Sequence, residues 1–352
     1  MKRILPFFVL FLIALSSFSI CSSEDFLLHE FGQGYFVSDV LYDPSIDSFY
    51  LVGTINESNN SFIVKSKNGQ VLRQETIEGF KVSKMQIDKF SNIYFLGTSE
   101  DNNISVIKLN SNLNERWETR IKVSERDIIS SFIVNDKQEV SVLGYSSGKK
   151  ESDTFIIKID ADGKIIIRNI INVGPFERPR EIIEDKNNNI YITGEMKEKD
   201  LDVFLLKLSS EHELLWIDYF DNSGWEDGGL DLDLIDEDIL LTAYSGKEGW
   251  YVFDTVFLKY YPDGNVSNVV RISYSGGSDW VRQLSRKEEN YYAILWDILT
   301  GKEYVMKLDY YFDIITKKEI PHEEVPIKII NISNNTYLVV QKENTVYLKN
   351  LD

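Results

Sequence analysis

Cysteine, histidine and proline are scarce in this chain. Its 352 residues contain one cysteine, three histidines and seven prolines. The single cysteine, Cys21, excludes a disulfide framework. The histidines, His29, His212 and His322, fall in different parts of the sequence and do not suggest a shared transition-metal site. We therefore expect neither a metal site nor a cofactor. No proline-rich or serine-rich stretch is long enough to act as a linker, which favours one continuous body.

Positive charge is also in short supply. Lysine and arginine number 38 against 56 aspartates and glutamates, giving a net charge of -18. Nucleic acid and anionic membrane surfaces require clustered basic residues, so both are excluded as expected partners. The sequence lacks a Gly-x-Ser-x-Gly elbow, a phosphate loop and a dinucleotide fingerprint. Because the chain has so many carboxylates, pairs at the spacing found in glycosidases arise by chance. Such a pair therefore does not indicate glycosidase activity.

The first residues predict an export signal. Lys2 and Arg3 precede an apolar stretch, Ile4 to Leu15, and small residues follow it. We predict a signal peptide over residues 1–22, and an extracytoplasmic protein that is secreted, periplasmic or surface-attached. At roughly a dozen residues the apolar stretch is too short to span a bilayer comfortably, and no later segment qualifies. Cys21 is a candidate lipidation site, but Ile20 stands where a lipoprotein signal has a small residue, so ordinary cleavage is favoured.

The rest of the chain repeats a unit of 42 to 52 residues. Each unit has a β-prone run that often ends in glycine, as in Ser48–Gly53, Asn92–Gly97 and Asn189–Gly194. A second run ends in lysine, at positions 65, 108, 158, 207, 259, 307 and 349. Asn-Gly or Asp-Gly turns follow several of these lysines, and a fourth strand carries Trp117 and Trp216, each nine residues after its lysine. Four short strands at this period are typical of β-propeller blades.

The pattern predicts an all-β fold, a seven-bladed β-propeller of four-stranded blades spanning residues 23–352. The final unit ends directly after its lysine strand, and the strand over residues 25–31 has no partner of its own. We therefore expect residues 25–31 to form the outer strand of the last blade and to close the ring. A β-sandwich with a second domain and an open β-solenoid are the alternatives. Units six and seven lack the glycine, which leaves a count between six and eight blades open.

These residues resemble the bacterial β-propeller repeats of the SBBP type. The best match runs over Asp185–Gly194, Asp202–Leu208 and Leu215-Trp216, and Asp153–Gly163 and Asp254–Lys259 repeat its second half. The resemblance covers essentially residues 25–352. It implies a propeller, often found in secreted or surface proteins of bacteria, and it brings no catalytic residues with it.

Candidate binding residues gather on one predicted rim of the propeller. Loops from the second to the third strand of a blade, and from each outer strand to the next blade, emerge at the same end. The candidates there are Trp225, Trp250, Trp280, Trp296, Arg180 and Arg282. Aromatic faces beside charged groups suit a glycan or a peptide. The alternative is that Trp225 and Trp280 simply pack between blades. A basic channel lining by Arg180, Arg282 and Lys328 is a weaker idea.

The favoured function is an exported, monomeric, non-enzymatic binding or scaffolding propeller whose ligand is a protein or a glycan. The rival is a carbohydrate-active hydrolase or lyase with the propeller fold. Its carboxylates would come from Glu226, Asp227, Asp254 and Asp279. A third hypothesis is a structural subunit of an envelope complex. The acidic run Glu226–Asp238 could bind calcium, but alternating leucine and aspartate favour a β-strand followed by an acidic turn.

Overall fold

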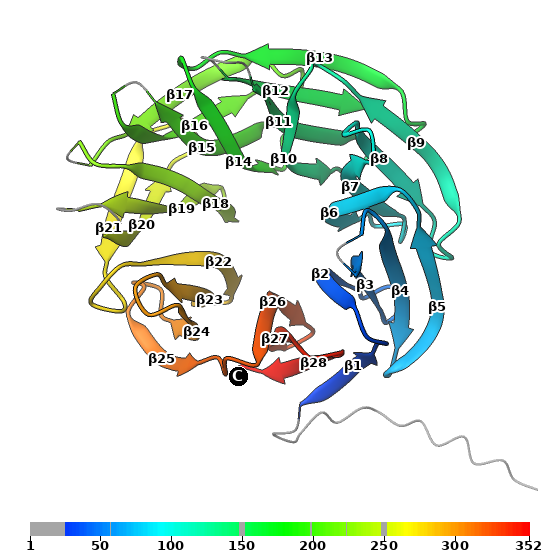
Figure 1. Ribbon diagram of the computed structural model, residues 1–352. Coiled ribbons are helices and arrows are strands. Elements are labelled where there is room, and N and C mark those ends of the chain that lie inside the picture. Colours follow the sequence, from blue (N-terminus) through cyan, green and yellow to red (C-terminus); the bar gives the residue numbers. More distant parts are fainter. Residues whose placement is uncertain (1–24, 57, 148–151, 198, 223, 248–251) are drawn as a thin grey trace, which may run out of the picture.

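The structure is a ring of seven antiparallel β-sheets, each of four strands (Figure 1). This computed structural model describes residues 25–56, 58–147, 152–197, 199–222, 224–247 and 252–352. The predicted signal peptide, Cys21 and Trp250 therefore lie outside the described residues. The seven-bladed β-propeller is confirmed, and the ring excludes both the β-sandwich and the open solenoid. None of the described residues forms a helix long and apolar enough to cross a membrane.

Strands occupy equivalent places in successive blades. The innermost strands are β2 (Tyr35–Asp43), β6 (Phe80–Ile87), β10 (Asp127–Val134), β14 (Glu177–Glu184), β18 (Asp227–Ile235), β22 (Asp279–Lys287) and β26 (Glu324–Ile332). The second strands are β3 (Ser48–Ile55), β7 (Ile93–Ser99), β11 (Val140–Ser147), β15 (Ile190–Lys197), β19 (Asp238–Gly246), β23 (Asn290–Asp297) and β27 (Asn335–Lys342). The third strands are β4 (Ser61–Lys67), β8 (Ile104–Leu109), β12 (Ser152–Ile159), β16 (Leu201–Leu208), β20 (Phe253–Tyr260), β24 (Lys302–Leu308) and β28 (Thr345–Asn350). The outer strands are β5 (Gln70–Ile77), β9 (Glu115–Ile121), β13 (Ile165–Ile171), β17 (Leu214–Phe220), β21 (Val266–Ile272), β25 (Ile314–Glu319) and β1 (Phe26–Glu30).

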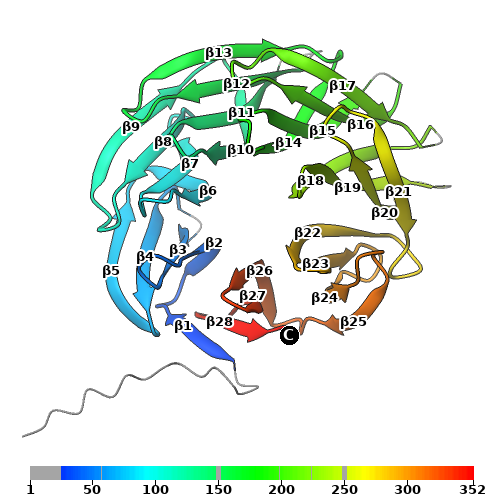
Figure 2. The same ribbon diagram turned by 180° about the vertical axis from the view of Figure 1, so that it is seen from behind.

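The two ends of the described chain meet in the last blade. Strand β1 pairs antiparallel with β28, with Phe26 opposite Leu348 and Glu30 opposite Thr345. Figure 2 shows dark-blue β1 beside red β28, at the edge of the seventh sheet. Leu28 is fully buried in a core cluster that joins blades one and seven. The predicted closure by residues 25–31 is therefore confirmed.

The repeated lysines act between neighbouring blades. Lys65, Lys108, Lys158 and Lys207 each place Nζ within 3.5 Å of a backbone carbonyl oxygen in the third-to-fourth-strand turn of the following blade. Trp117 and Trp216 donate their indole N–H to two of the same turns, at 3.0 and 3.2 Å. These bonds cross the four boundaries between blades one and five at one fixed point in the repeat. They explain why lysine and tryptophan keep a constant spacing in the sequence.

The repeated glycine faces a β-bulge in every blade that has it. Each innermost strand has a register shift near its middle, and the residue just before the shift pairs with Gly53, Gly97, Gly144 or Gly194 in the first four blades. A Cβ at Gly97 would lie 2.3 Å from the carbonyl oxygen of Lys81. Blades five to seven carry Ala243, Leu295 and Val340 at this place and still form the bulge, so the number of blades is seven.

Replacing Gly97 by alanine is expected to lower the free energy of unfolding by about 1 to 3 kcal/mol, because the new methyl group meets backbone that must move. Gly32→Ala is the matched control, since a Cβ at Gly32 makes only an ordinary contact of 3.8 Å with Tyr35. Chemical denaturation of both variants checks the prediction. Equal stability of the two variants would contradict the steric role of Gly97.

Candidate functional site

The innermost strands of all seven blades line a central cavity of about 1010 Å³. In each of these strands the bulge inserts one unpaired residue, so two successive side chains line the cavity instead of alternating across the sheet. The unpaired residues form what we call the bulge ring: Ser38, Ser83, Ser130, Arg180, Leu230, Arg282 and Ile327. The residues that follow them form the axial ring: Asp39, Lys84, Ser131, Glu181, Asp231, Gln283 and Lys328.

The axial ring is held by hydrogen bonds around the channel. Lys84 Nζ lies 2.7 Å from Glu181 Oε2, and Lys328 Nζ lies 3.0 Å from Asp39 Oδ1. Asp39, Asp231 and Gln283 each accept a bond from the backbone N–H that follows the axial residue of the next blade, at 3.0 to 3.3 Å. These polar side chains are therefore positioned by the blades themselves.

Three arginines lie at one end of the cavity. Arg180 Nη2 is 2.6 Å from Glu195 Oε1, and Arg178 Nη1 is 3.9 Å from the other oxygen of the same carboxylate. Glu195 has only 2% of its side chain exposed, whereas both arginines are close to half exposed. Arg282 forms an ion pair with Glu303 and is also about half exposed. Two guanidinium groups thus share one buried carboxylate and keep hydrogen-bond donors that face the cavity.

Aromatic rings lie beside these arginines. Trp280 and Tyr244 line the cavity with ring centroids 5.1 Å apart, and Phe253 packs against both. A Cβ at Gly228 would lie 2.5 Å from the Tyr244 ring, so glycine is needed for this close approach. Burial, followed by the neighbouring Glu195 carboxylate, raises the pKa of Tyr244 well above its ordinary value. Tyr244 therefore keeps its proton at neutral pH.

The sequence-based candidates are partly brought together. Arg180 and Arg282 share the bulge ring, and Trp280 lines the same cavity. Trp296 pairs with Trp280 across β22 and β23, with ring centroids 5.5 Å apart in a T-shaped contact. Trp225 lies before β18, is 37% exposed and is not among the residues that line the cavity. Trp280 packs between blades and also faces the cavity. It therefore fits both the prediction of a binding residue and the alternative of packing between blades.

The carboxylates considered for a hydrolase or lyase are used within the loops. Asp254 forms ion pairs with Lys247 and Arg271. Asp279 accepts hydrogen bonds from the backbone N–H groups of Tyr274 and Ser275 at 3.4 and 2.7 Å. Asp227 is the first residue of β18 and is buried, while Glu226 is exposed. None of these four lines the central cavity among the described residues.

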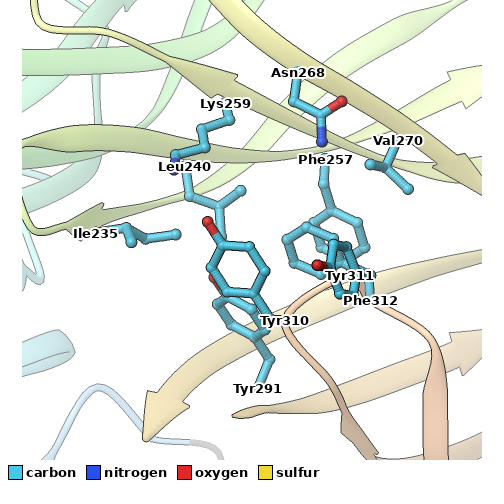
Figure 3. Close-up of a pocket in the computed structure, with 10 residues that line it drawn as sticks. All are labelled: Ile235, Leu240, Phe257, Lys259, Asn268, Val270, Tyr291, Tyr310, Tyr311 and Phe312. Carbon is cyan, nitrogen blue, oxygen red and sulfur yellow. The ribbon is translucent and has the colours of Figure 1, made fainter. Parts of the chain in front are cut away.

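A second hollow lies between blades five and six. It measures about 110 Å³ and is lined mainly by apolar and aromatic side chains, including Phe257, Tyr291 and Tyr310 (Figure 3). Phe312 stacks on Phe257 at 4.0 Å and on Tyr291 at 4.8 Å, and it fills much of the junction. Ligand pockets usually measure about 300 to 1,000 Å³. The central cavity is therefore the candidate site.

Comparison with known proteins supports the fold alone. No family model matches the chain, and no curated protein matches it, so the resemblance to SBBP repeats stays a prediction. Solved β-propellers are similar in structure at low sequence identity. An ulvan lyase of a polysaccharide lyase family, bound to -[GlcA(1-4)Rha3S]-, has a TM-score of 0.61 and 10% identity, covering 93% of this chain and 95% of that one.

Two further structures show the same architecture. The β-propeller domain of the trilobed protease of Pyrococcus furiosus has a TM-score of 0.57 and 13% identity, and covers 91% of this chain and 97% of that one. That domain is described as having an open velcro topology, whereas β1 and β28 are paired here. The periplasmic gluconolactonase of Pseudomonas aeruginosa has a TM-score of 0.57 and 11% identity, with coverages of 80% and 84%.

Proposed function

We propose that this chain is a binding propeller whose central cavity takes an acidic oligosaccharide. The observation that carries the proposal is the grouping of Arg178, Arg180 and Arg282 beside Trp280 and Tyr244 on the cavity wall. This arginine cluster is notable in a chain of net charge -18. Guanidinium groups bind carboxylates and sulfates through paired, charge-assisted hydrogen bonds.

Sugar rings suit the aromatic part of the wall. Trp and Tyr offer a flat apolar surface together with a polar group, which matches the mixed faces of a sugar. The cavity is concave, whereas stable protein–protein contacts usually cover broad surfaces, so a glycan fits better than a folded protein. The ulvan lyase binds a uronate- and sulfate-bearing oligosaccharide on the same fold, which is an analogy of fold only.

Binding is favoured over catalysis because none of the four carboxylates considered for a hydrolase or lyase lines the central cavity among the described residues. The carboxylates considered for the enzyme hypothesis serve as loop caps or ion-pair partners. We further propose an extracytoplasmic location, on the basis of the predicted signal peptide over residues 1–22.

Calorimetric titration with glucuronate-containing oligosaccharides, and with neutral dextran fragments of equal length, tests the proposed function. We expect binding of the acidic series only, with an affinity that falls as salt is added. The double variant Arg178→Gln/Arg282→Gln keeps the Arg180–Glu195 pair and is expected to bind at least tenfold more weakly, because each lost charged hydrogen bond contributes about 1.5 to 3 kcal/mol.

Arg120→Gln is the matched control, because it removes one exposed positive charge from outer strand β9. Its affinity should stay within about twofold of wild type, as expected for a surface substitution. Equal affinities for the double variant and wild type would refute the proposed site. Release of shortened sugars during the titration would instead support the carbohydrate-active enzyme.

A further inference from the structure

The turns between third and fourth strands lie at the boundaries between blades. In blades two to six the fourth residue of this turn has a positive φ, between 59 and 93°. These residues are Leu113, Gly163, His212, Gly264 and Phe312. The repeated lysine of the preceding blade reaches each of the five turns. The five residues therefore occupy equivalent places at successive boundaries.

Apolar side chains from the turn itself fill two of these boundaries. Leu113 belongs to the core cluster that joins blades one and two, and Phe312 belongs to the one that joins blades five and six. An indole ring from the preceding blade fills two others. A Cβ at Gly163 would lie 2.8 Å from the ring of Trp117, and the next glycine-bearing turn meets Trp216 in the same way. Four of the five boundaries are thus filled by side chains that carry no charge at any ordinary pH.

His212 stands at the remaining boundary, between blade three (β10–β13) and blade four (β14–β17), which are neighbours in the ring (Figure 1). The residue is only 1% exposed, and neither ring nitrogen has a hydrogen-bond partner among the described residues. A neutral imidazole buried in this way leaves one N–H donor and one acceptor unpaired. A protonated imidazole would be far more costly there, because it would be a buried charge.

The charge nearest to this imidazole is already positive. Lys158 of β12 lies at the same boundary, with Nζ 3.2 Å from the backbone carbonyl oxygen of Ser210 and 3.1 Å from Glu139 Oε2. Lys158 and Glu139 therefore balance one another. A proton on His212 would add a second positive charge beside this pair.

Three further carboxylates belong to this part of the boundary. Glu184, at the end of β14, shares the side-chain amide of Asn135 with Glu139. Glu211 and Glu213 flank the histidine in its own turn and are exposed to water. None of these carboxylates forms a hydrogen bond with the imidazole in the described part of the chain. They are therefore not positioned to stabilise its charged form.

We propose that His212 makes the boundary between blades three and four a pH-sensitive switch, which is closed while the imidazole is neutral and loosens when the ring takes up a proton. Burial, and then the neighbouring Lys158 ammonium, lowers the pKa of His212 from 6.5 to about 4. The unfolded chain takes up this proton near pH 6.5, whereas the folded boundary resists it until the pH approaches 4. The stability that the neutral ring contributes is therefore complete above pH 6.5 and is lost as the pH falls towards 4.

The switch also affects the central cavity, because the innermost strands of the same two blades line it. Ser131 of β10 donates a hydrogen bond to Glu181 of β14 across this boundary, and both side chains belong to the axial ring. Loosening the boundary moves β10 away from β14 and breaks this contact. The wall of the cavity is therefore less well fixed in acid.

Urea denaturation of wild type and His212→Leu at pH 7 and pH 4.5 tests the switch. Leucine suits the position because Leu113 has nearly the same backbone conformation at the equivalent place, with φ 59° against 63°. We expect the folding equilibrium constant of wild type, relative to that of the variant, to fall by about tenfold or more from pH 7 to pH 4.5. Groups that titrate in both proteins cancel in this ratio. His212→Asn also lacks a titrating ring and tolerates a positive φ, so it should behave like the leucine variant.

Hydrogen exchange at pH 4.5 locates the effect within the ring. Amides of β13 and of the turn between β16 and β17 should exchange faster in wild type than in His212→Leu. Amides of β5 and of the turn that holds Leu113 should exchange alike in both proteins, because the boundary between blades one and two has no titrating ring in the equivalent place.

His322→Leu is the matched control, because it removes an exposed histidine from the turn between β25 and β26, away from this boundary. Its stability should keep the pH dependence of wild type. A ratio for His212→Leu that stays the same from pH 7 to pH 4.5 would overturn the proposal, and so would an equal loss of pH dependence in His322→Leu. Faster exchange in acid that is spread evenly over all the blade boundaries would also overturn it, since the whole ring would then be opening together.

Discussion

Leu28→Ala is expected to lower the free energy of unfolding by about 3 to 5 kcal/mol, because Leu28 is fully buried and its removal leaves a cavity. Leu28 belongs to the outer strand contributed by the N-terminal segment. Its backbone carbonyl accepts a hydrogen bond from Ser66 Oγ at 3.1 Å, which adds a contact to blade one. The side chain therefore packs at the junction between the first and last blades.

Leu27→Ala provides the control on the same strand. Leu27 is 42% exposed, and its truncation should change the free energy of unfolding by no more than about 0.5 kcal/mol. Urea denaturation of both variants measures the difference. If β1 contributed little to closing the ring, Leu28→Ala would cost less than about 1 kcal/mol, and the two leucines would be nearly equivalent.

The fold was predictable because its repeat is carried by residues that act at blade boundaries. Lys108 and Lys207 bond to the next blade, and Trp117 and Trp216 bond to the same turns. A contact made once per blade must recur once per repeat, so its period is visible in the sequence. The role of the strand over residues 25–31 was predictable for a related reason. The last repeat lacks its fourth strand, so another part of the chain must supply that strand.

The cavity wall was only partly predictable. Regular alternation along β14 would place Arg178 and Arg180 on one face and Glu181 on the other. The bulge turns Arg180 and Glu181 toward the same channel, and the sequence gives no sign of that extra residue. Glu195 and Tyr244 were missed because they lie on second strands. The hydrophobic pattern of these strands predicts only that they are buried. Only the register relative to the repeated lysines could have marked their positions.

The approach of Asp202, Asp221 and Asp227 to one another was beyond sequence reasoning for a similar reason. Asp221 and Asp227 belong to the same acidic stretch of chain, but Asp202 lies on a different strand and reaches them only through the pairing of β16 with β17. The predicted strand within Glu226–Asp238 is confirmed as β18. Asp202 belongs to the repeated third-strand pattern, and nothing in that pattern marks it as a neighbour of the other two aspartates.

Asp231→Asn is expected to make the protein more stable at pH 8 than wild type by about 2 to 4 kcal/mol, and to have little effect near pH 4. Burial, and then the nearby Glu181 carboxylate, raises the pKa of Asp231 from 3.8 to about 7. The folded state therefore holds a proton that the unfolded chain releases at much lower pH. Wild type loses this stability as the pH rises from about 4 to about 7, and the asparagine variant does not.

Denaturation with urea at pH 4.5, 6 and 8 measures this difference, and Asp39→Asn serves as the control at the equivalent place in the axial ring. Asp39 is paired with Lys328, so its replacement should lower stability rather than raise it at pH 8.

The protonation of Asp231 also affects binding of the proposed ligand. When Asp231 is neutral the cavity wall, which has five basic side chains, carries one negative charge fewer, so an acidic oligosaccharide should bind more tightly below pH 7 than above it. A stability difference between wild type and Asp231→Asn that stays constant from pH 4.5 to 8 would show that Asp231 is ionised throughout, and the pH-dependent binding would then be lost with it.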